Sequence, residues 1–242
     1  MNIPDVKSIP FFTTVPYNAI PLDQATADTL NQAYSAYNAA IQNPAFGLSA
    51  DEIAKRTISF SAGQNAIVIE DETLTNLAGF DPALLSMRQA TAEDLILLPA
   101  SAYLGTEDPN SAGDTPPSGK PWGLGTPLVD ADVLIPSEIQ AIDTARTAYN
   151  TTIKDAADNN DNLVLYDAAA MMEALKASGI SFGTGSVTGD FAKGGAFSLD
   201  GVHPTARGYA LIANGIVDAI NAGFNANVHK VDPVNYPTIF LK

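Results

Sequence analysis

Residues 163–177 join a short apolar run directly to a helical one. Leu163-Val164-Leu165-Tyr166 has the length of a strand and ends at the carboxylate of Asp167. Ala168 to Ala177 consists mainly of helix formers, and Gly179 predicts the end of that helix. A strand that passes straight into a helix is the repeating unit of a parallel sheet. The segment therefore predicts an α/β protein with a parallel sheet.

Two further apolar runs have the character of buried strands. Ala66 to Ile69 ends in Glu70-Asp71, and Leu95 to Leu98 precedes Pro99. Continuous apolar strands are typical of parallel sheets, because helices cover both faces of such a sheet. Thr57 to Phe60 alternates in polarity and predicts a strand that pairs with the first of these runs.

Three longer segments have apolar residues three and four apart, which predicts amphipathic helices over residues 23–41, 136–157 and 204–223. In the second helix the expected buried stripe consists of Ile139, Ile142, Ala145, Tyr149 and Ile153. Before the first helix, four prolines among residues 1–21 predict an extended, loop-like entry.

The charge balance narrows the choice of partners. Lys and Arg total 12 against 27 Asp and Glu, so the formal charge is −15. Such a surface repels phosphate backbones and anionic lipid, which argues against nucleic-acid binding. The apolar runs are far shorter than the ~20 residues of a spanning helix, so we expect no membrane span. Residues 1–5 lack the basic and apolar regions of a signal peptide.

The sequence contains no cysteine, which excludes a disulfide framework, a thiolate metal site and a cysteine nucleophile. Residues 158–162 resemble the start of a calcium loop, but Leu163 stands where the required glycine would be. We therefore expect neither a metal nor a cofactor. The cellular compartment is left open.

Residues 105–127 are rich in Gly, Pro, Ser, Thr and Asp and predict a long loop inserted in the domain. Loops of this length in compact domains are either functional lids and binding loops or disordered segments. Trp122, the single tryptophan, would line a substrate groove or anchor the loop by packing.

Two histidines are the candidates for proton transfer near neutral pH. His203 follows Asp200 by three residues, in a loop between Gly194-Gly195 and the helix that Pro204 begins. A carboxylate that binds one imidazole nitrogen leaves the other free to take a proton from a nucleophile. The alternative is that both residues merely cap and terminate local structure. His229 lies in a polar tail and is expected to be a solvated surface residue.

The segment from Gly195 to Ala210 reads Gly-Ala-Phe-Ser-Leu-Asp-Gly-Val-His-Pro-Thr-Ala-Arg-Gly-Tyr-Ala and resembles the final conserved block of the SGNH/GDSL hydrolases, particularly bacterial members. Weaker similarity extends to residues 3–16, 127–130 and 136–150, and so over nearly the whole chain. The resemblance implies a serine esterase or lipase that cleaves a small-molecule, lipid or carbohydrate ester. It further implies a three-layer α/β/α domain over residues 1–242 with a flavodoxin-like parallel sheet, in which His203 is the general base and Asp200 orients it.

The family pattern also implies a nucleophilic serine in a Gly-Asp-Ser-like block, followed by a glycine and an asparagine of the oxyanion hole. No Gly-Asp-Ser, Gly-Asn-Ser or Gly-x-Ser-x-Gly sequence occurs among residues 1–242. We therefore expect the chain to be the carboxyl-terminal portion of such an enzyme, without the first strands and inactive alone. A sheet edge left open in this way would allow self-association. Related full-length proteins are often exported.

A second hypothesis comes from a different class of protein. The chain would be a non-catalytic binding domain, or an inactive fragment, that keeps the same fold. Residues 105–127 would then hold a ligand or a partner.

Overall fold

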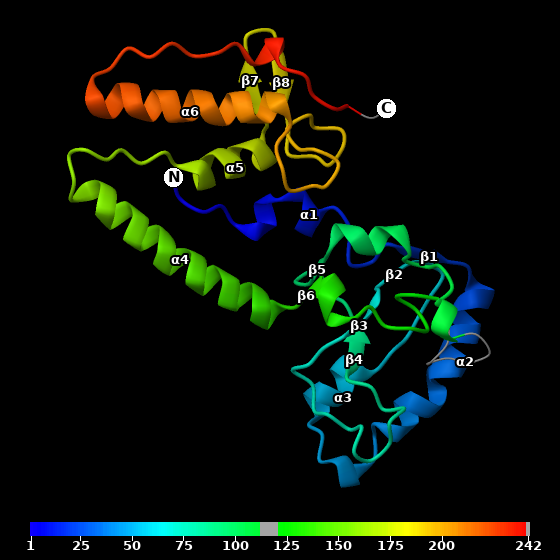
Figure 1. The fold of residues 1–242 in the computed structure, drawn as a ribbon. Helices are drawn as coiled ribbons and strands as arrows, with labels where there is room; N and C mark the ends of the chain where they lie inside the picture. The colour runs from blue at the N-terminus through cyan, green and yellow to red at the C-terminus, as the bar shows by residue number, and fades with distance from the viewer. Residues whose placement is uncertain (112–120, 241–242) are drawn as a thin grey trace. The chain divides into compact units, whose positions relative to one another are not determined.

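The computed structural model describes residues 1–111 and 121–240 and divides the chain into two compact units (Figure 1). Unit 1 comprises Met1–Thr14 and Ser137–Lys242, and unit 2 comprises Val15–Pro136. Each unit has its own cluster of buried apolar side chains. The single domain expected over residues 1–242 stays a prediction.

The described strands form four separate two-stranded sheets, and all four are antiparallel. The predicted three-layer α/β/α arrangement around a flavodoxin-like parallel sheet is therefore wrong. The pairs are β1 (Ile20–Leu22) with β2 (Gly63–Asn65), β3 (Val68–Glu70) with β4 (Met87–Gln89), β5 (Leu95–Ile96) with β6 (Val133–Leu134), and β7 (Ile180–Phe182) with β8 (Gly185–Val187).

The way the chain returns to each apolar run explains the antiparallel pairing. Residues 71–86 connect β3 to β4 through turns and bends and contain no helix. A parallel pair needs a crossover connection, usually a helix, whereas a chain that turns back directly pairs antiparallel. The same holds for β7 and β8, which Gly183 joins in a tight turn with a φ of 48°.

Leu163–Tyr166, the strand expected in the parallel sheet, belongs to no sheet. Its backbone receives one long-range hydrogen bond, from the Asn2 amide to the Tyr166 carbonyl at 3.4 Å. Val164 and Tyr166 pack against helix α6 (Ala206–Phe224) where that helix has Gly223 and Gly215. A Cβ atom at Gly215 would lie 2.4 Å from the Tyr166 ring, so glycine is what allows this close approach.

The predicted long helices are confirmed. They are α2 (Gln24–Ala40), α4 (Pro136–Asp158), α5 (Ala168–Ala177) and α6. Side chains of Asp23, Asp167 and Thr205 cap α2, α5 and α6 by accepting hydrogen bonds from backbone amides of the first turn. Local signals of this kind act within a few residues, so the sequence pattern locates these helices well.

Shorter helices were not expected from the sequence. They are α1 (Pro10–Thr13) and α3 (Ala50–Arg56), and the 3-10 turns Val6–Ser8, Pro44–Phe46, Leu98–Ala102, Pro109–Ser111, Asp130–Asp132 and Pro233–Asn235. The helix α1 lies in the segment predicted to be extended. The predicted stripe of α4 is also wrong, since Ile139 is its one buried member and Tyr149 is 61% exposed. The sheet that this stripe would cover does not form.

Asparagine side chains on α2 hold the segment that was predicted to be a strand at Thr57 to Phe60. The Asn38 carboxamide accepts from the Ile58 amide at 3.0 Å and donates to the Ile58 carbonyl at 2.8 Å. Asn31 binds the amide and carbonyl of Phe60 in the same way, at 2.8 and 2.9 Å. The segment belongs to none of the four sheets: α2 side chains hold Ile58 and Phe60, and the Gln89 side chain accepts from the Ser59 amide at 3.1 Å.

Unit 1 repeats this arrangement. Asn150 on α4 accepts from the Ile3 amide at 2.7 Å and donates to the Ile3 carbonyl at 2.9 Å. On α6, Asn214 and Asn221 bind the backbone of the segment that follows the helix. Each carboxamide supplies the donor and the acceptor that a neighbouring strand would otherwise supply.

The ends of the predicted loop at 105–127 are described, but residues 112–120 lie outside the described residues, and the lid and disorder alternatives lie there with them. The Gly105 amide donates to the Trp122 carbonyl at 2.9 Å, which joins the two ends. The Trp122 ring packs edge-on against Tyr103 with centroids 5.6 Å apart. This contact supports the expectation that Trp122 anchors the loop.

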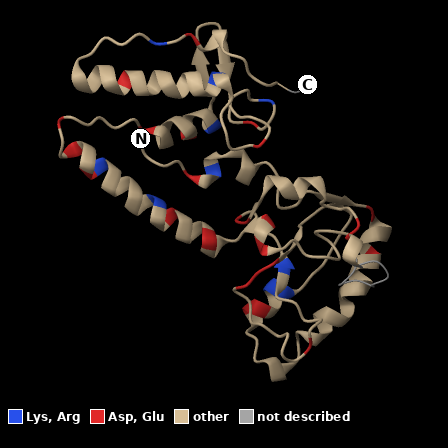
Figure 2. Ribbon diagram, in the orientation of Figure 1, with Lys and Arg blue, Asp and Glu red and all other residues tan. Residues whose placement is uncertain are grey.

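In residues 1–111 and 121–240, none of the helices has both the length and the apolar character needed to cross a bilayer. Figure 2 shows acidic residues distributed along both units, in keeping with the formal charge of −15.

The Asn38→Ala variant tests the helix-to-backbone pairing. Ile58 is 1% exposed, so its amide and carbonyl would lose their partners in a buried position. We expect the free energy of unfolding to fall by about 1–3 kcal/mol. Urea unfolding followed by the fluorescence of Trp122, the single tryptophan, measures it in unit 2.

The control is Asn76→Ala, because the exposed Asn76 side chain accepts a local hydrogen bond from the Ala78 amide. Its expected cost is below about 0.5 kcal/mol. Equal losses in the two variants would contradict the importance of the pairing.

Candidate functional site

Asp200 and His203 lie in a closed loop of unit 1 that leads into α6. Phe197 and Pro204 form an antiparallel bridge across its base, and the Ser198 amide donates to the His203 carbonyl at 2.8 Å. Gly201, at a φ of 72°, makes the turn at the tip. This compact loop holds the two predicted site residues three positions apart with their side chains in contact.

The Asp200 carboxylate is the centre of the loop. Its Oδ1 atom accepts from the Ser198 hydroxyl at 2.6 Å and from the Val202 and His203 amides at 2.9 Å each. Its Oδ2 atom lies 2.6 Å from Nδ1 of His203. Backbone bonds therefore fix the carboxylate, and the carboxylate in turn fixes the imidazole ring.

The electrostatics of the loop keep Asp200 ionised. The Ser198 hydroxyl, the Val202 and His203 amides and the His203 ring all donate to the carboxylate and lower its pKa well below the usual 3.8. An ionised carboxylate only accepts hydrogen bonds, so Nδ1 of His203 carries the proton that it donates. In the neutral ring, Nε2 then has a free lone pair.

Nε2 of His203 is available to an outside group. The His203 side chain is 69% exposed and that of Asp200 is 49% exposed. Among residues 1–111 and 121–240, no group forms a hydrogen bond with Nε2. The structure thus brings together the two residues predicted to act as orienting acid and base, and no serine of the described residues is bonded to the His203 ring. His229, the other histidine, lies exposed in the segment after α6.

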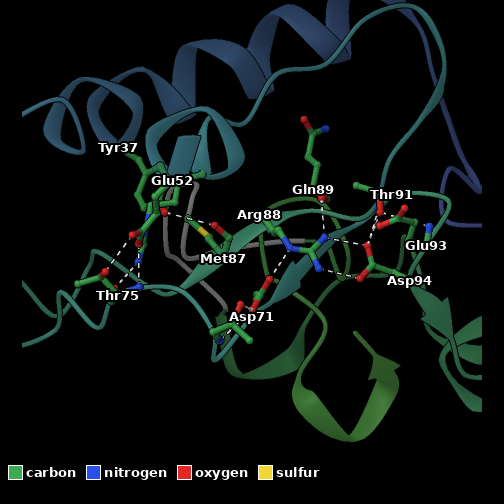
Figure 3. Close-up of polar contacts among 12 residues, drawn as sticks. Tyr37, Glu52, Asp71, Thr75, Met87, Arg88, Gln89, Thr91, Glu93 and Asp94 are labelled. Atoms are coloured by element: carbon green, nitrogen blue, oxygen red, sulfur yellow. Dashed lines mark hydrogen bonds and ion pairs between the residues drawn. The ribbon is translucent and has the colours of Figure 1, made fainter. Parts of the chain in front are cut away.

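A second constellation of charged residues is buried in unit 2 (Figure 3). Arg88 on β4 donates from Nε to Asp71 at 2.5 Å and from its two terminal nitrogens to Asp94 at 2.7 and 2.8 Å. All three residues are at most 6% exposed. The side chain and amide of Thr73 also donate to Asp71, and those of Thr91 also donate to Asp94. With its donors and acceptors used inside the protein, this triad serves the structure of unit 2.

Arg56 forms a related network beside the triad. Its side chain is fully buried and donates to Glu52 at 3.0 Å, to the Leu85 carbonyl at 3.2 Å and to the Thr75 carbonyl. Glu52 also accepts from the amide and hydroxyl of Thr75. This arginine ties α3 to the loop between β3 and β4.

Searches against protein-family models, curated proteins and solved structures found no match to this chain. The similarity to the SGNH/GDSL hydrolases, and the roles of Asp200 and His203 in catalysis, therefore stay predictions.

Sequence reasoning did not assign a role to Ser198 or to the two arginines. Ser198 stands two residues before Asp200, a spacing at which a hydroxyl reaches a neighbouring loop carboxylate. Arg88 is buried at the centre of β4, and a buried arginine requires carboxylate partners. Those partners come from separate segments, so spacing alone could not identify them.

The Ser198→Ala variant tests the electrostatics of the loop. The Ser198 hydroxyl is the largest contributor to the lowered pKa of Asp200, so its removal should raise that pKa toward 3.8. The Asp200–His203 contact would then be lost at a higher pH as the solution is acidified. A carboxyl 13C NMR titration measures the midpoint. Ser198→Thr retains a hydroxyl and should keep the midpoint low; an unchanged midpoint in Ser198→Ala would contradict the assignment.

The buried triad predicts acid sensitivity of unit 2. Burial alone would raise the pKa of Asp71, but hydrogen bonds from Thr73 and Arg88 outweigh it and hold the pKa below 3.8. A carboxylate with a lowered pKa in the folded state stabilises the protein above its unfolded pKa, and this contribution is lost as the pH falls through the folded value. Urea unfolding should therefore show stability falling below about pH 4.

Asp71→Asn removes the titrating group, so we expect a shallower loss of stability below about pH 4 than in the unmodified chain. Asp81→Asn changes an exposed aspartate whose bond is local, to the Ala83 amide, and serves as the control. The same pH profile for both variants would argue against a role for the triad.

Proposed function

We propose that Asp200 and His203 form the acid/base half of a serine carboxylic ester hydrolase of the SGNH/GDSL type. The contact of 2.6 Å between Asp200 Oδ2 and His203 Nδ1, in a loop that leaves the His203 side chain exposed, is the observation that supports this proposal. An aspartate that orients an imidazole in this way is the arrangement that activates a serine. The proposal rests on the loop and makes no use of a parallel sheet.

In the proposed reaction a serine hydroxyl attacks the acyl carbonyl carbon, and Nε2 of His203 takes the hydroxyl proton. The imidazolium then gives this proton to the alcohol oxygen as the ester bond breaks, which leaves an acyl-serine. Water, deprotonated by Nε2 of His203, then attacks the acyl carbon, and the imidazolium returns this proton to the serine oxygen as the acyl–serine bond breaks and the carboxylic acid leaves. Asp200 stays ionised throughout and stabilises the imidazolium.

The proposed nucleophile is a serine that does not belong to residues 1–242, because these residues contain none of the family's serine blocks. The chain by itself is then inactive. Its substrates in the complete site are esters of small alcohols, lipids or carbohydrates, as the resemblance implies.

A fluorophosphonate probe, which labels activated serines, tests the function in the natural gene product that contains residues 1–242. We expect labelling of a serine outside these residues, and a labelling rate at least about 100-fold lower in His203→Ala. His229→Ala is the matched control, since it removes the other, exposed histidine, and it should label at the normal rate. The chain of residues 1–242 alone should neither be labelled nor hydrolyse p-nitrophenyl acetate faster than its His203→Ala variant.

Three results would count against the proposal. Labelling that is insensitive to His203→Ala would remove the histidine from the mechanism. Turnover by residues 1–242 that depends on His203 would show that the nucleophile is present in the chain. A gene product without any labelled serine would favour the alternative of a non-catalytic binding domain.

A further inference from the structure

The segment that follows α6 turns back and runs along that helix. We call residues 226–240 the C-terminal strap. The turn is made at Asn225, which has a φ of 49° and ends the helix. Figure 1 shows the strap passing beside α6 and on toward β7 and β8, all within unit 1.

Three side chains of α6, spaced seven residues apart, bind the backbone of the strap. Asn221 exchanges two hydrogen bonds with the backbone of Val228 at 2.7 and 2.9 Å, and Asn214 does the same with Val231 at 2.8 and 2.9 Å. Arg207 donates to the carbonyls of Pro233, Val234 and Tyr236. Seven helical residues rise about 10.5 Å. Three extended residues span about 10 Å, so the two spacings match.

The far end of the strap reaches the base of the loop that carries Asp200 and His203. The Thr238 hydroxyl donates to the Gly195 carbonyl and lies 3.2 Å from the Thr205 hydroxyl. Thr205 Oγ1 itself donates to the Gly195 carbonyl at 2.8 Å. The Phe240 ring lies directly over Gly195, where a Cβ atom would come within 2.6 Å of it.

Gly195 and Thr205 are the two ends of the loop. The Thr205 amide donates to the Ala196 carbonyl at 2.9 Å, and Thr205 also caps α6 by accepting from the Gly208 amide. The hydroxyl of Thr238 therefore contacts both ends of the loop: Gly195, where the loop begins, and Thr205, where it passes into α6. Nothing else in the strap is bonded to the loop among the described residues.

We propose that Thr238 is a positioning residue, through which the C-terminal strap holds the Asp200–His203 pair in its bonded geometry. Release of the strap would widen the base of the loop and loosen the contact between the carboxylate and the imidazole. The strap then controls the site without touching substrate. This inference rests on the proposed function, because it concerns the geometry of the same pair.

The test follows the proton on Nδ1 of His203 by NMR in the chain of residues 1–242. That proton lies in a bond of 2.6 Å, and the exposed His229 offers an internal comparison in the same spectrum. We expect Thr238→Val, which keeps the shape but removes the hydroxyl, to speed exchange of this proton with water about fivefold, as the loss of one hydrogen bond implies. Thr238→Ser, which keeps the hydroxyl, should restore slow exchange.

The control variant is Lys230→Gln, which breaks the contact of 2.7 Å between Lys230 and Asp218 elsewhere in the strap. It should leave the His203 proton unchanged. Wild-type exchange in Thr238→Val, or the same acceleration in Lys230→Gln, would overturn the proposal. If Thr238→Val fails to fold, the comparison between Thr238→Ser and Phe240→Leu decides, with slow exchange expected in the first and faster exchange in the second.

This measurement needs neither a nucleophile nor turnover, so its failure is distinct from failure of the proposed esterase function. If the His203 proton exchanges rapidly in Thr238→Val but the fluorophosphonate probe labels no serine, the positioning role of Thr238 stands and the proposed esterase function is contradicted. If exchange is unaffected in Thr238→Val but labelling depends on His203, the esterase function is supported and the positioning role is contradicted.

Discussion

A side-chain carboxamide and a backbone peptide group offer the same pair of hydrogen-bonding atoms, and this equivalence determines how the extended parts of the chain are held. Five asparagines on α2, α4 and α6 each bind both the amide and the carbonyl of one residue in an extended segment; they are Asn31, Asn38, Asn150, Asn214 and Asn221. Because a helix takes the part of the neighbouring strand, neither unit needs a continuous sheet. The remaining strand pairing is confined to the short two-stranded sheets.

Local signals predicted the long helices, whereas the partners of the extended segments could not be predicted. Caps and apolar spacing act within a few residues, and they locate α2, α4, α5 and α6. An apolar run such as Leu163–Tyr166 has the same pattern whether it lies in a sheet or against a helix with glycines at the contact. One signal was present: Asn31 and Asn38, like Asn214 and Asn221, are seven residues apart and so lie on one face of a helix.

The candidate site likewise has one part that local sequence could predict and another that depends on residues far apart in the chain. Asp200 and His203 are three residues apart in one loop, so their contact follows from local geometry, while their catalytic roles stay a prediction. The support of that loop by Thr238 comes from a residue far along the chain, and no spacing connects the two. The Arg88 triad likewise joins separate segments of unit 2. A buried arginine needs carboxylate partners, and the fold decides which ones.

The hydrogen bonds between α6 and the C-terminal strap determine how strictly the register of the strap along the helix is fixed. The two asparagines of the helix bind peptide groups and not side chains, and the strap presents a valine at every third position, Val228, Val231 and Val234. A slip of three residues would bring Asn214 opposite another valine with the same backbone groups. Alignment is therefore decided at the two ends, by the turn at Asn225 and by Thr238 at Gly195. A change in the number of residues between these ends would shift the alignment of the strap with α6. Substitutions of side chains between the two ends would have little effect on that alignment.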